Sequence, residues 1–142
     1  MQSILIATDG SEGADRAVDV AAEIAKGLGG SLSSLTVGGN LSTEEMRQLS
    51  LGEKDFADAL DSLSKQVLRR AMERAQRLGI SMAKTHIAWG DPASAIIETI
   101  HRESIDAVVV GRRGRGQLTG LLLGSVSQKV VTLAPCIVIV VP

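Results

Sequence analysis

Aromatic side chains are almost absent from this chain of 142 residues, which contains one Phe, one Trp and no Tyr. Proteins that bind single-stranded nucleic acid stack the bases on several aromatic side chains, so the composition argues against that class. A core built from this sequence must consist of Ala, Val, Ile and Leu. Apolar residues make up 44% of the chain and charged residues 22%, which is typical of a folded globular protein and argues against disorder.

Cysteine is scarce as well, because Cys136 is the single residue of its type. One cysteine excludes an intrachain disulfide and a cysteine metal cluster, and it favours a reducing compartment. The opening MQSILIATDG has no charged lead and only a short apolar run, which predicts neither a signal peptide nor a membrane span. We therefore expect a cytoplasmic protein with no membrane contact and a single domain over residues 1–142.

Acidic residues are missing from the last quarter of the chain. Residues 107–142 carry four basic and no acidic side chains, whereas residues 1–106 carry 11 basic and 16 acidic ones. Three of the four basic side chains, Arg112, Arg113 and Arg115, fall within four positions. This asymmetry indicates a local anionic partner, and the alternative is a solvated basic loop.

Short β-branched runs alternate with helical patterns along the sequence. Strands are predicted at about 4–7, 31–37, 81–89, 106–110 and 137–141, and helices at about 14–28, 56–78, 92–102 and 125–133. This alternation predicts an α/β fold with a mainly parallel five-stranded sheet covered by helices on both faces. Asp91 and Pro92 form a helix start, and capping boxes are predicted at Ser125 with Gln128 and, opening a short helix, at Ser42 with Glu45.

The predicted helix at 56–78 has one apolar and one basic face. We expect the basic face to be solvated, and a nucleic-acid surface is the less favoured alternative. The histidines are expected at the surface, because no third ligand stands at metal-binding spacing, and Cys136 and Trp89 are expected to pack. The apolar stripe comprises Phe56, Leu60, Leu63, Val67, Ala71, Ala75 and Leu78; the basic face comprises Lys65, Arg69, Arg70, Arg74 and Arg77; the histidines are His86 and His101.

Candidate ligand-binding residues follow the first predicted strand. In an open α/β sheet, ligands bind beyond the carboxyl ends of the strands, where the strand order reverses. Asp9 stands at such a position and could accept hydrogen bonds from ribose hydroxyls or help to hold a metal on phosphates. The alternative is that Asp9 or Ser11 caps the next helix. We favour the ligand role for Asp9 and the capping role for Ser11.

A second candidate is the glycine- and arginine-rich segment 111–120, with Gly124 and Ser125 opening the last helix. Glycines let backbone N–H groups approach a ligand, helix N-termini attract phosphate, and guanidinium groups match phosphate oxygens. The composition is that of a phosphate-binding loop. Two known fingerprints do not fit, because Gln117 and Leu118 replace the Lys and Ser/Thr of a Walker A loop, and no acidic residue follows to bind ribose as in Rossmann dehydrogenases.

A different signature does fit. The spacing Gly111-x2-Gly114-x9-Gly124-Ser125 resembles the nucleotide-binding signature of the universal stress protein family. The resemblance covers nearly the whole chain, with residues 38–55 the weak part. It is carried by ILIATDGS at 4–11, GDP at 90–92, DAVVVG at 106–111, LLLGSVS at 121–127 and APC at 134–136 before the last apolar strand.

The resemblance implies a Rossmann-like open sheet of order 3-2-1-4-5, and ATP as ligand with Mg²⁺ held through its phosphates. Asp9, with Ala7 and Thr8 beside it, would contact the ribose and phosphate region. Val37 would meet adenine through its backbone. Gly111, Arg112, Arg113 and Gly114 would wrap ribose and phosphate, and Gly124, Ser125, Val126 and Ser127 would donate backbone or hydroxyl hydrogen bonds to phosphates.

These observations predict a cytoplasmic ATP-binding sensor or regulator of the stress response. No dedicated catalytic residue is evident, so any ATP hydrolysis is expected to be slow. The last strand, Ile137 to Val141, is apolar throughout, and at a sheet edge it would need a partner. We expect antiparallel pairing with a second copy in a homodimer, as the resemblance also implies. The alternative function is a protein-interaction module of the same fold that binds no nucleotide.

Overall fold

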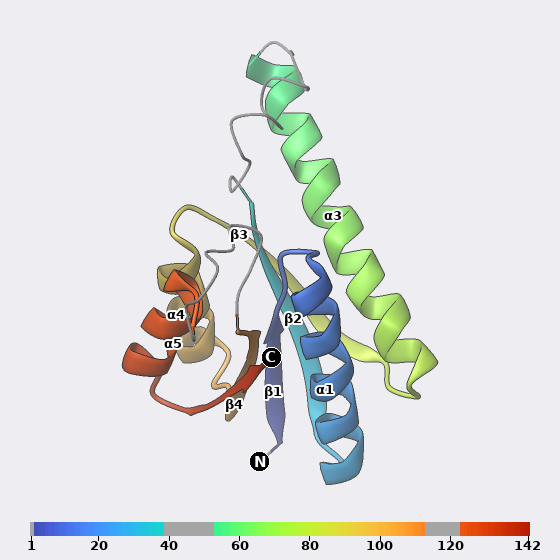
Figure 1. Cartoon of the computed structure of the whole chain (residues 1–142). Helices are drawn as coiled ribbons and strands as arrows, with labels where there is room; N and C mark the ends of the chain where they lie inside the picture. Colours follow the sequence, from blue (N-terminus) through green and yellow to red (C-terminus); the bar gives the residue numbers. More distant parts are fainter. Residues whose placement is uncertain (1, 39–52, 113–122) are drawn as a thin grey trace.

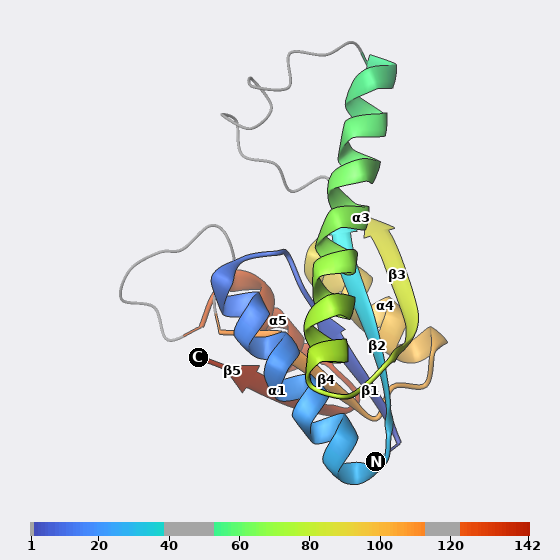
Figure 2. The same cartoon turned by 90° about the vertical axis from the view of Figure 1, so that its right-hand side faces the viewer.

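In the described part of the chain, the fold is a parallel β-sheet with two helices on each face (Figures 1 and 2). The structure is a computed structural model that describes residues 2–38, 53–112 and 123–142. The elements in chain order are β1 (Ser3–Ala7), α1 (Glu12–Leu28), β2 (Ser31–Gly38), α3 (Glu53–Arg77), β3 (Met82–Trp89), α4 (Pro92–Arg102), β4 (Ala107–Gly111), α5 (Ser125–Leu133) and β5 (Ile137–Val141). The strand order is β3-β2-β1-β4-β5, which confirms the predicted fold class and topology.

Two apolar clusters separate the faces of the sheet. One joins α1 and α3 to β1, β2 and β4, and the other joins α4 and α5 to the opposite face of the same strands. Successive residues of β1 alternate between them, since Ile4 and Ile6 belong to the first cluster and Leu5 to the second. The central strands are buried on both faces, which explains why their sequences are continuous apolar runs. In the first cluster, the two helices contribute mainly alanine and valine: Ala17, Val18, Ala21, Ala22, Ala25, Ala71 and Ala75.

Local signals define most helix ends as expected. Ser11 is the N-cap of α1 and its hydroxyl accepts a hydrogen bond from the N–H of Ala14 at 3.2 Å, so the capping role predicted for Ser11 is confirmed. Asp91 caps α4 and Pro92 is its first residue. The capping box predicted at Ser125 is wrong, because the N-cap of α5 is Gly124 and no side chain caps this helix. The helix predicted at Ser42 lies outside the described residues.

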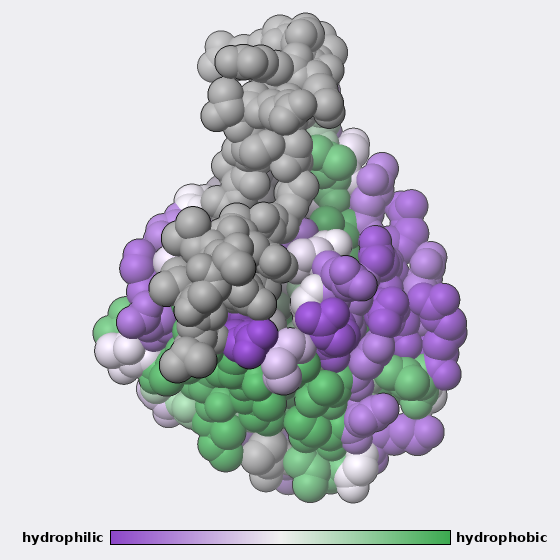
Figure 3. Space-filling model, in the orientation of Figure 1, coloured by the Kyte–Doolittle hydropathy of each residue, from purple (hydrophilic) through white to green (hydrophobic). Residues whose placement is uncertain are grey.

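The two edge strands differ in character. β5 is apolar, and Ile137 at its start is 51% exposed. Figure 3 shows hydrophobic surface gathered low in the view, where Figure 1 places β5 and the neighbouring elements, and hydrophilic surface along the side formed by α1 and α3. The other edge strand, β3, carries the exposed Lys84. Its last residue, Trp89, is 52% exposed and lies over the backbone of Gly38.

One of the two histidines is not at the surface, contrary to expectation. The side chain of His86 on β3 is only 14% exposed, and its Nε2 lies 3.4 Å from Oε1 of Glu103, the residue that ends α4. Burial lowers the pKa of His86, and the carboxylate of Glu103 opposes this effect. His101 is exposed as predicted, and Cys136 is half-buried against the α4–α5 cluster.

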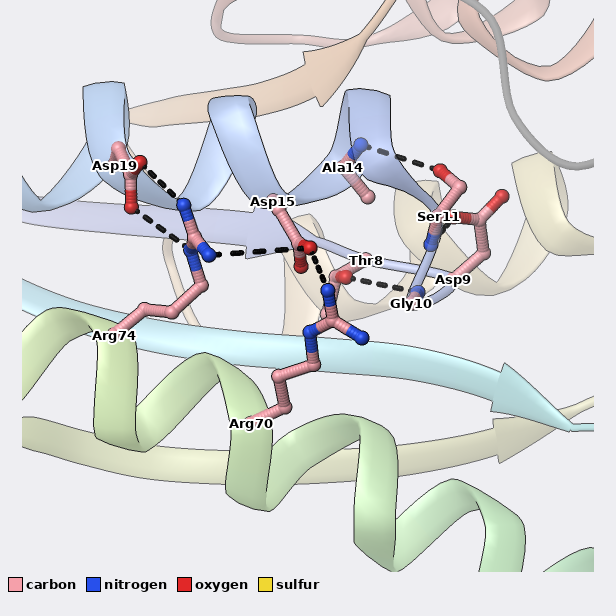
Figure 4. A network of polar contacts seen from close by, with 9 residues as sticks. All are labelled: Thr8, Asp9, Gly10, Ser11, Ala14, Asp15, Asp19, Arg70 and Arg74. Atoms are coloured by element: carbon pink, nitrogen blue, oxygen red, sulfur yellow. Dashed lines mark hydrogen bonds and ion pairs between the residues drawn. The ribbon is translucent and has the colours of Figure 1, made fainter.

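The basic face of α3 is exposed as expected at Lys65, Arg69, Arg70 and Arg77, whereas Arg74 is half-buried. Arg70 pairs with Asp15 of α1, and Arg74 donates to both carboxylate oxygens of Asp19, at 3.0 and 2.6 Å (Figure 4). The apolar stripe also differs from the predicted one, because Leu63 is 38% exposed whereas Ser64 and Leu68 are buried with Ala71 and Ala75.

Candidate functional site

The carboxyl edge of the sheet brings together the two segments that sequence reasoning selected. β1 and β4 are adjacent and parallel, so the loop after Ala7 and the segment after Gly111 leave the sheet side by side. The helices that follow β1 and β4 cover opposite faces of the sheet, α1 one face and α5 the other. This reversal point is where an open α/β sheet binds ligands.

The loop at residues 8–11 is shaped by short-range hydrogen bonds (Figure 4). Thr8 is buried and its N–H donates to the carbonyl of Leu35 on β2 at 2.9 Å. The N–H of Gly10 donates to the Thr8 hydroxyl at 3.2 Å, and the N–H of Ser11 donates to Oδ1 of Asp9 at 2.9 Å. Asp9 is half-buried and does not cap α1. Its carboxylate is therefore oriented at the edge of the sheet by the backbone that follows it.

The carbonyl of Arg112 ties β4 to the start of α5. It accepts a hydrogen bond from the N–H of Gly124 at 2.8 Å and one from the hydroxyl of Ser127 at 2.7 Å. The N–H of Arg112 itself donates to Val141 of β5 at 2.7 Å. Ser127 is 3% exposed, and its hydroxyl also lies 3.1 Å from the Gly124 carbonyl. The Ser127 hydroxyl is thus occupied within the fold, and its N–H is the group left to meet a ligand.

The first turn of α5 presents backbone donors. The first hydrogen bond within the helix runs from the N–H of Gln128 to the carbonyl of Gly124, at 3.0 Å. The N–H groups of Ser125, Val126 and Ser127 precede it and find no acceptor among the described residues. The first turn contains no acidic residue. Three parallel N–H groups at the positive end of a helix dipole form an anion-binding arrangement.

The guanidinium of Arg112 adds a second donor to this edge. Its Nε is buried and has no hydrogen-bond partner within the described part of the chain. A buried N–H of a charged group without a partner costs free energy, unless an anion supplies the acceptor. Arg112 directly follows β4, so this donor and the donors of α5 belong to the same edge.

The other predicted site residues fall into two groups. Val37, near the end of β2, and Val126, in the first turn of α5, are half-buried and pack against the α4–α5 cluster. Arg113 and Gly114 lie outside the described residues. Sequence reasoning missed the anchoring role of the Arg112 carbonyl, because a backbone acceptor leaves no residue-type signal.

Residues 2–38, 53–112 and 123–142 contain no group of three or more His, Cys, Asp or Glu side chains that could hold a metal ion. None of the helices in these ranges combines the length and the apolar composition needed to cross a membrane.

Comparison with known proteins agrees with this architecture. The model of the universal stress protein family matches residues 1–142. A universal stress protein of Thermus aquaticus is 36% identical over 148 residues, which cover 99% of this chain and 98% of that protein. Two similar solved structures each cover 99% of this chain and 97% of their own: UspA of Lactobacillus plantarum, with a TM-score of 0.82 and 26% identity, and a universal stress protein in complex with cAMP, with a TM-score of 0.75 and 28% identity. The chain therefore belongs to the universal stress protein family.

Proposed function

We propose that this chain binds ATP at the carboxyl edge of the sheet and acts as a sensor or regulator in the stress response. The phosphates would lie at the start of α5, where the N–H groups of Ser125, Val126 and Ser127 point out of the helix. Gly111, Arg112, Arg113 and Gly114 would wrap the ribose and phosphates. Asp9, with Ala7 and Thr8, would face the ribose, and the backbone of Val37 would meet adenine.

Charge supports an anionic ligand at this edge. Residues 107–142 carry no acidic side chain, and Arg112, whose carbonyl is bonded to the start of α5, has a buried Nε without a partner among the described residues. A relative with 28% identity is described as a complex with cAMP, which shows that the family fold accommodates an adenine nucleotide. Mg²⁺ would be held through the phosphates, because no cluster of three metal ligands exists among the described residues. We assign no catalytic residue and expect slow hydrolysis at most.

The observation that carries the proposal is the row of N–H groups at the start of α5, which find no acceptor in the described part of the chain. A pair of variants at Ser125 tests it. Ser125→Pro deletes one N–H donor at the first helical position, which tolerates proline. Gly124 has φ −71° and ψ 168°, a conformation that a following proline allows. Ser125→Ala removes the exposed hydroxyl and keeps the N–H. We expect Ser125→Pro to weaken ATP binding by about 10-fold or more in calorimetry, since a charge-assisted hydrogen bond contributes about 1.5–3 kcal/mol.

Ser125→Ala should keep the ATP affinity within about twofold of the natural chain, if backbone N–H groups are the ligands. Equal affinities in both variants would contradict the phosphate position. Absence of ATP binding by the natural chain, together with absence of nucleotide in its acid extract, would instead favour a protein-interaction module of the same fold.

We further propose that β5 pairs with the β5 strand of a second copy to form a homodimer. The N–H of Ile137 donates to Asp106 and the carbonyl of Val141 accepts from Arg112, so both of these residues direct their backbone toward β4. The backbone groups of the alternate residues Val138 and Val140 therefore face the open edge. An apolar strand with free backbone groups pairs readily with another copy.

Val138→Pro tests the dimer without removing a hydrogen bond to β4, because proline is tolerated on edge strands when its missing N–H faces outward. We expect the natural chain to sediment as a dimer and the Val138→Pro variant as a folded monomer. A natural chain that sediments as a monomer at micromolar concentration would contradict the proposal.

The compartment we propose is the cytoplasm, since the single cysteine, Cys136, needs no oxidising environment.

A further inference from the structure

Helix α3 touches the site loop at a backbone position. Gly10 has a φ of +79°, a backbone conformation that residues other than glycine rarely adopt. A Cβ atom built on Gly10 would lie 3.0 Å from Cγ2 of Val67, on the facing side of α3. Gly10 is the residue between Asp9 and Ser11, which are joined by the hydrogen bond from the Ser11 N–H to the Asp9 carboxylate. The shape of the turn that orients Asp9 is therefore limited directly by α3.

An ion pair fixes the same end of α1 to α3. Asp15 lies one helical turn after the cap residue Ser11, and its side chain is 9% exposed. Its carboxylate pairs with Arg70 and lies 4.0 Å from Nη1 of Arg74 (Figure 4). Asp15 is too deeply buried to be satisfied by water alone, so the position of α1 at this turn depends on α3.

A second ion pair joins the same helices one turn further from the loop. Arg74 donates to both oxygens of Asp19, at 3.0 and 2.6 Å. The two pairs therefore have the same chemistry and lie on the same two helices. They differ in distance from the site, because the Asp15 pair adjoins the cap of α1 and the Asp19 pair does not (Figure 4).

Within the described ranges, only the C-terminal half of α3 packs on the rest of the fold. Leu68, Ala71 and Ala75 dock the C-terminal half of the helix on the α1 face. The N-terminal half continues past the carboxyl ends of the strands, on the side of the molecule where the site loops lie (Figures 1 and 2). Val67 and Arg70 stand where the docked half meets the extending half, so they sit where a tilt of α3 would reach the loop.

We propose that Val67 and Arg70 are positioning residues for the nucleotide site, and that nucleotide binding is coupled to the docking of α3 on α1. The coupling rests on the proposed function. It is reciprocal: whatever displaces α3 weakens ATP binding, and bound ATP strengthens the docking of α3. The fold of α3 would then make it the element through which a partner reads or changes the nucleotide state.

The variants Asp15→Asn and Asp19→Asn test this coupling as a matched pair. Each removes one negative charge from α1, one turn apart. Long-range electrostatics alone predicts that both strengthen the binding of anionic ATP. Positioning predicts that Asp15→Asn weakens ATP binding by about fivefold or more, the lower range of allosteric coupling. Asp19→Asn should stay within about twofold of the natural chain or bind slightly more tightly.

Calorimetric titration of the full chain with MgATP, at two ionic strengths, supplies the affinities, and urea unfolding without nucleotide shows that each variant is folded. Val67→Ala changes no charge and serves as the second probe; it should also weaken ATP binding, and it decides the question if Asp15→Asn does not fold. Equal affinities for the natural chain, Asp15→Asn and Val67→Ala would overturn the coupling and leave the proposed function standing. A natural chain that binds no ATP would overturn both.

Discussion

Helices α4 and α5 cover the same face of the sheet, yet they begin in opposite ways. Asp91 closes the start of α4, since its Oδ2 accepts hydrogen bonds from the N–H and the hydroxyl of Ser94 at 2.9 and 2.8 Å. The start of α5 is open, because its cap residue Gly124 has no side chain to do the same. A capping carboxylate occupies the position where a phosphate would bind. The difference assigns a structural role to one helix start and leaves the other available for a ligand.

Closing the start of α5 should have the largest effect. Gly124 has φ −71° and ψ 168°, which any residue can adopt, so Gly124→Asp can cap α5 as Asp91 caps α4. We expect ATP affinity to fall by about 100-fold or more, because the new carboxylate takes the N–H groups and repels phosphate. The free energy of unfolding should rise by only a few tenths of a kcal/mol, because glycine at an N-cap is almost as stabilising as Asp or Asn.

Gly124→Asn is the control for charge, because it offers a capping oxygen without repelling phosphate. Its ATP affinity should lie between those of the natural chain and Gly124→Asp in calorimetry, with a similar gain in stability by urea denaturation. If Gly124→Asp bound ATP normally, the phosphates would have to lie elsewhere.

Loosening the start of α5 should have an intermediate effect. Ser127→Ala removes the buried hydroxyl that holds the Arg112 carbonyl, and we expect it to lower the free energy of unfolding by about 1 kcal/mol. ATP should bind more weakly, since one of the two hydrogen bonds that tie the helix start to the Arg112 carbonyl is lost. Thr132→Ala removes an exposed hydroxyl that bonds within the same helix, to Gln128, and should change neither quantity measurably. Equal effects of the two variants in denaturation and calorimetry would argue against the anchor.

Neutralising the cap residue of α4 should have the smallest effect, on stability alone. Hydrogen bonds from Ser94 hold the pKa of Asp91 below its usual range. A depressed folded-state pKa stabilises the fold above the unfolded pKa of about 3.9, and this contribution is lost as the pH falls through the folded value. Asp91→Asn should therefore reduce the loss of unfolding free energy between pH 6 and pH 2, measured by urea denaturation at each pH.

ATP affinity at neutral pH should be unchanged in Asp91→Asn. A loss of ATP binding in this variant would mean that α4 also contributes to the site, and the contrast between the two helices would no longer hold.

Elements with a strong local signal were predictable from the sequence. The apolar run after Ser3 predicts β1, and the dipeptide Asp91-Pro92 predicts the start of α4 within one residue. The general rule for open α/β sheets, and not any single motif, selected Asp9 and Gly111, and both lie at the reversal point. These features depend on adjacent residues or on the order of strands and helices, and both can be read from the sequence.

Features that depend on distant partners were not predictable. The ion pairs of Arg70 and Arg74 leave no local signal, because Asp15 and Asp19 lie 55 positions away on α1. The sequence gives no sign that His86 is shielded from solvent, because its neighbour Glu103 lies 17 positions further along the chain, at the end of α4. Ser125 has the spacing of a capping box, but the helix begins one residue earlier than this pattern requires.

The position of Trp89 decides what an optical titration of this protein would report. It is the chain's single tryptophan, and its indole rests on Gly38, the residue after Val37, three strands away from β4. In the proposed binding mode, its emission would respond to the base end of the nucleotide, and the triphosphate would lie far from it. ATP should change the fluorescence of Trp89, whereas inorganic tripolyphosphate bound at the start of α5 should leave it unchanged. The two ends of the ligand could then be followed separately.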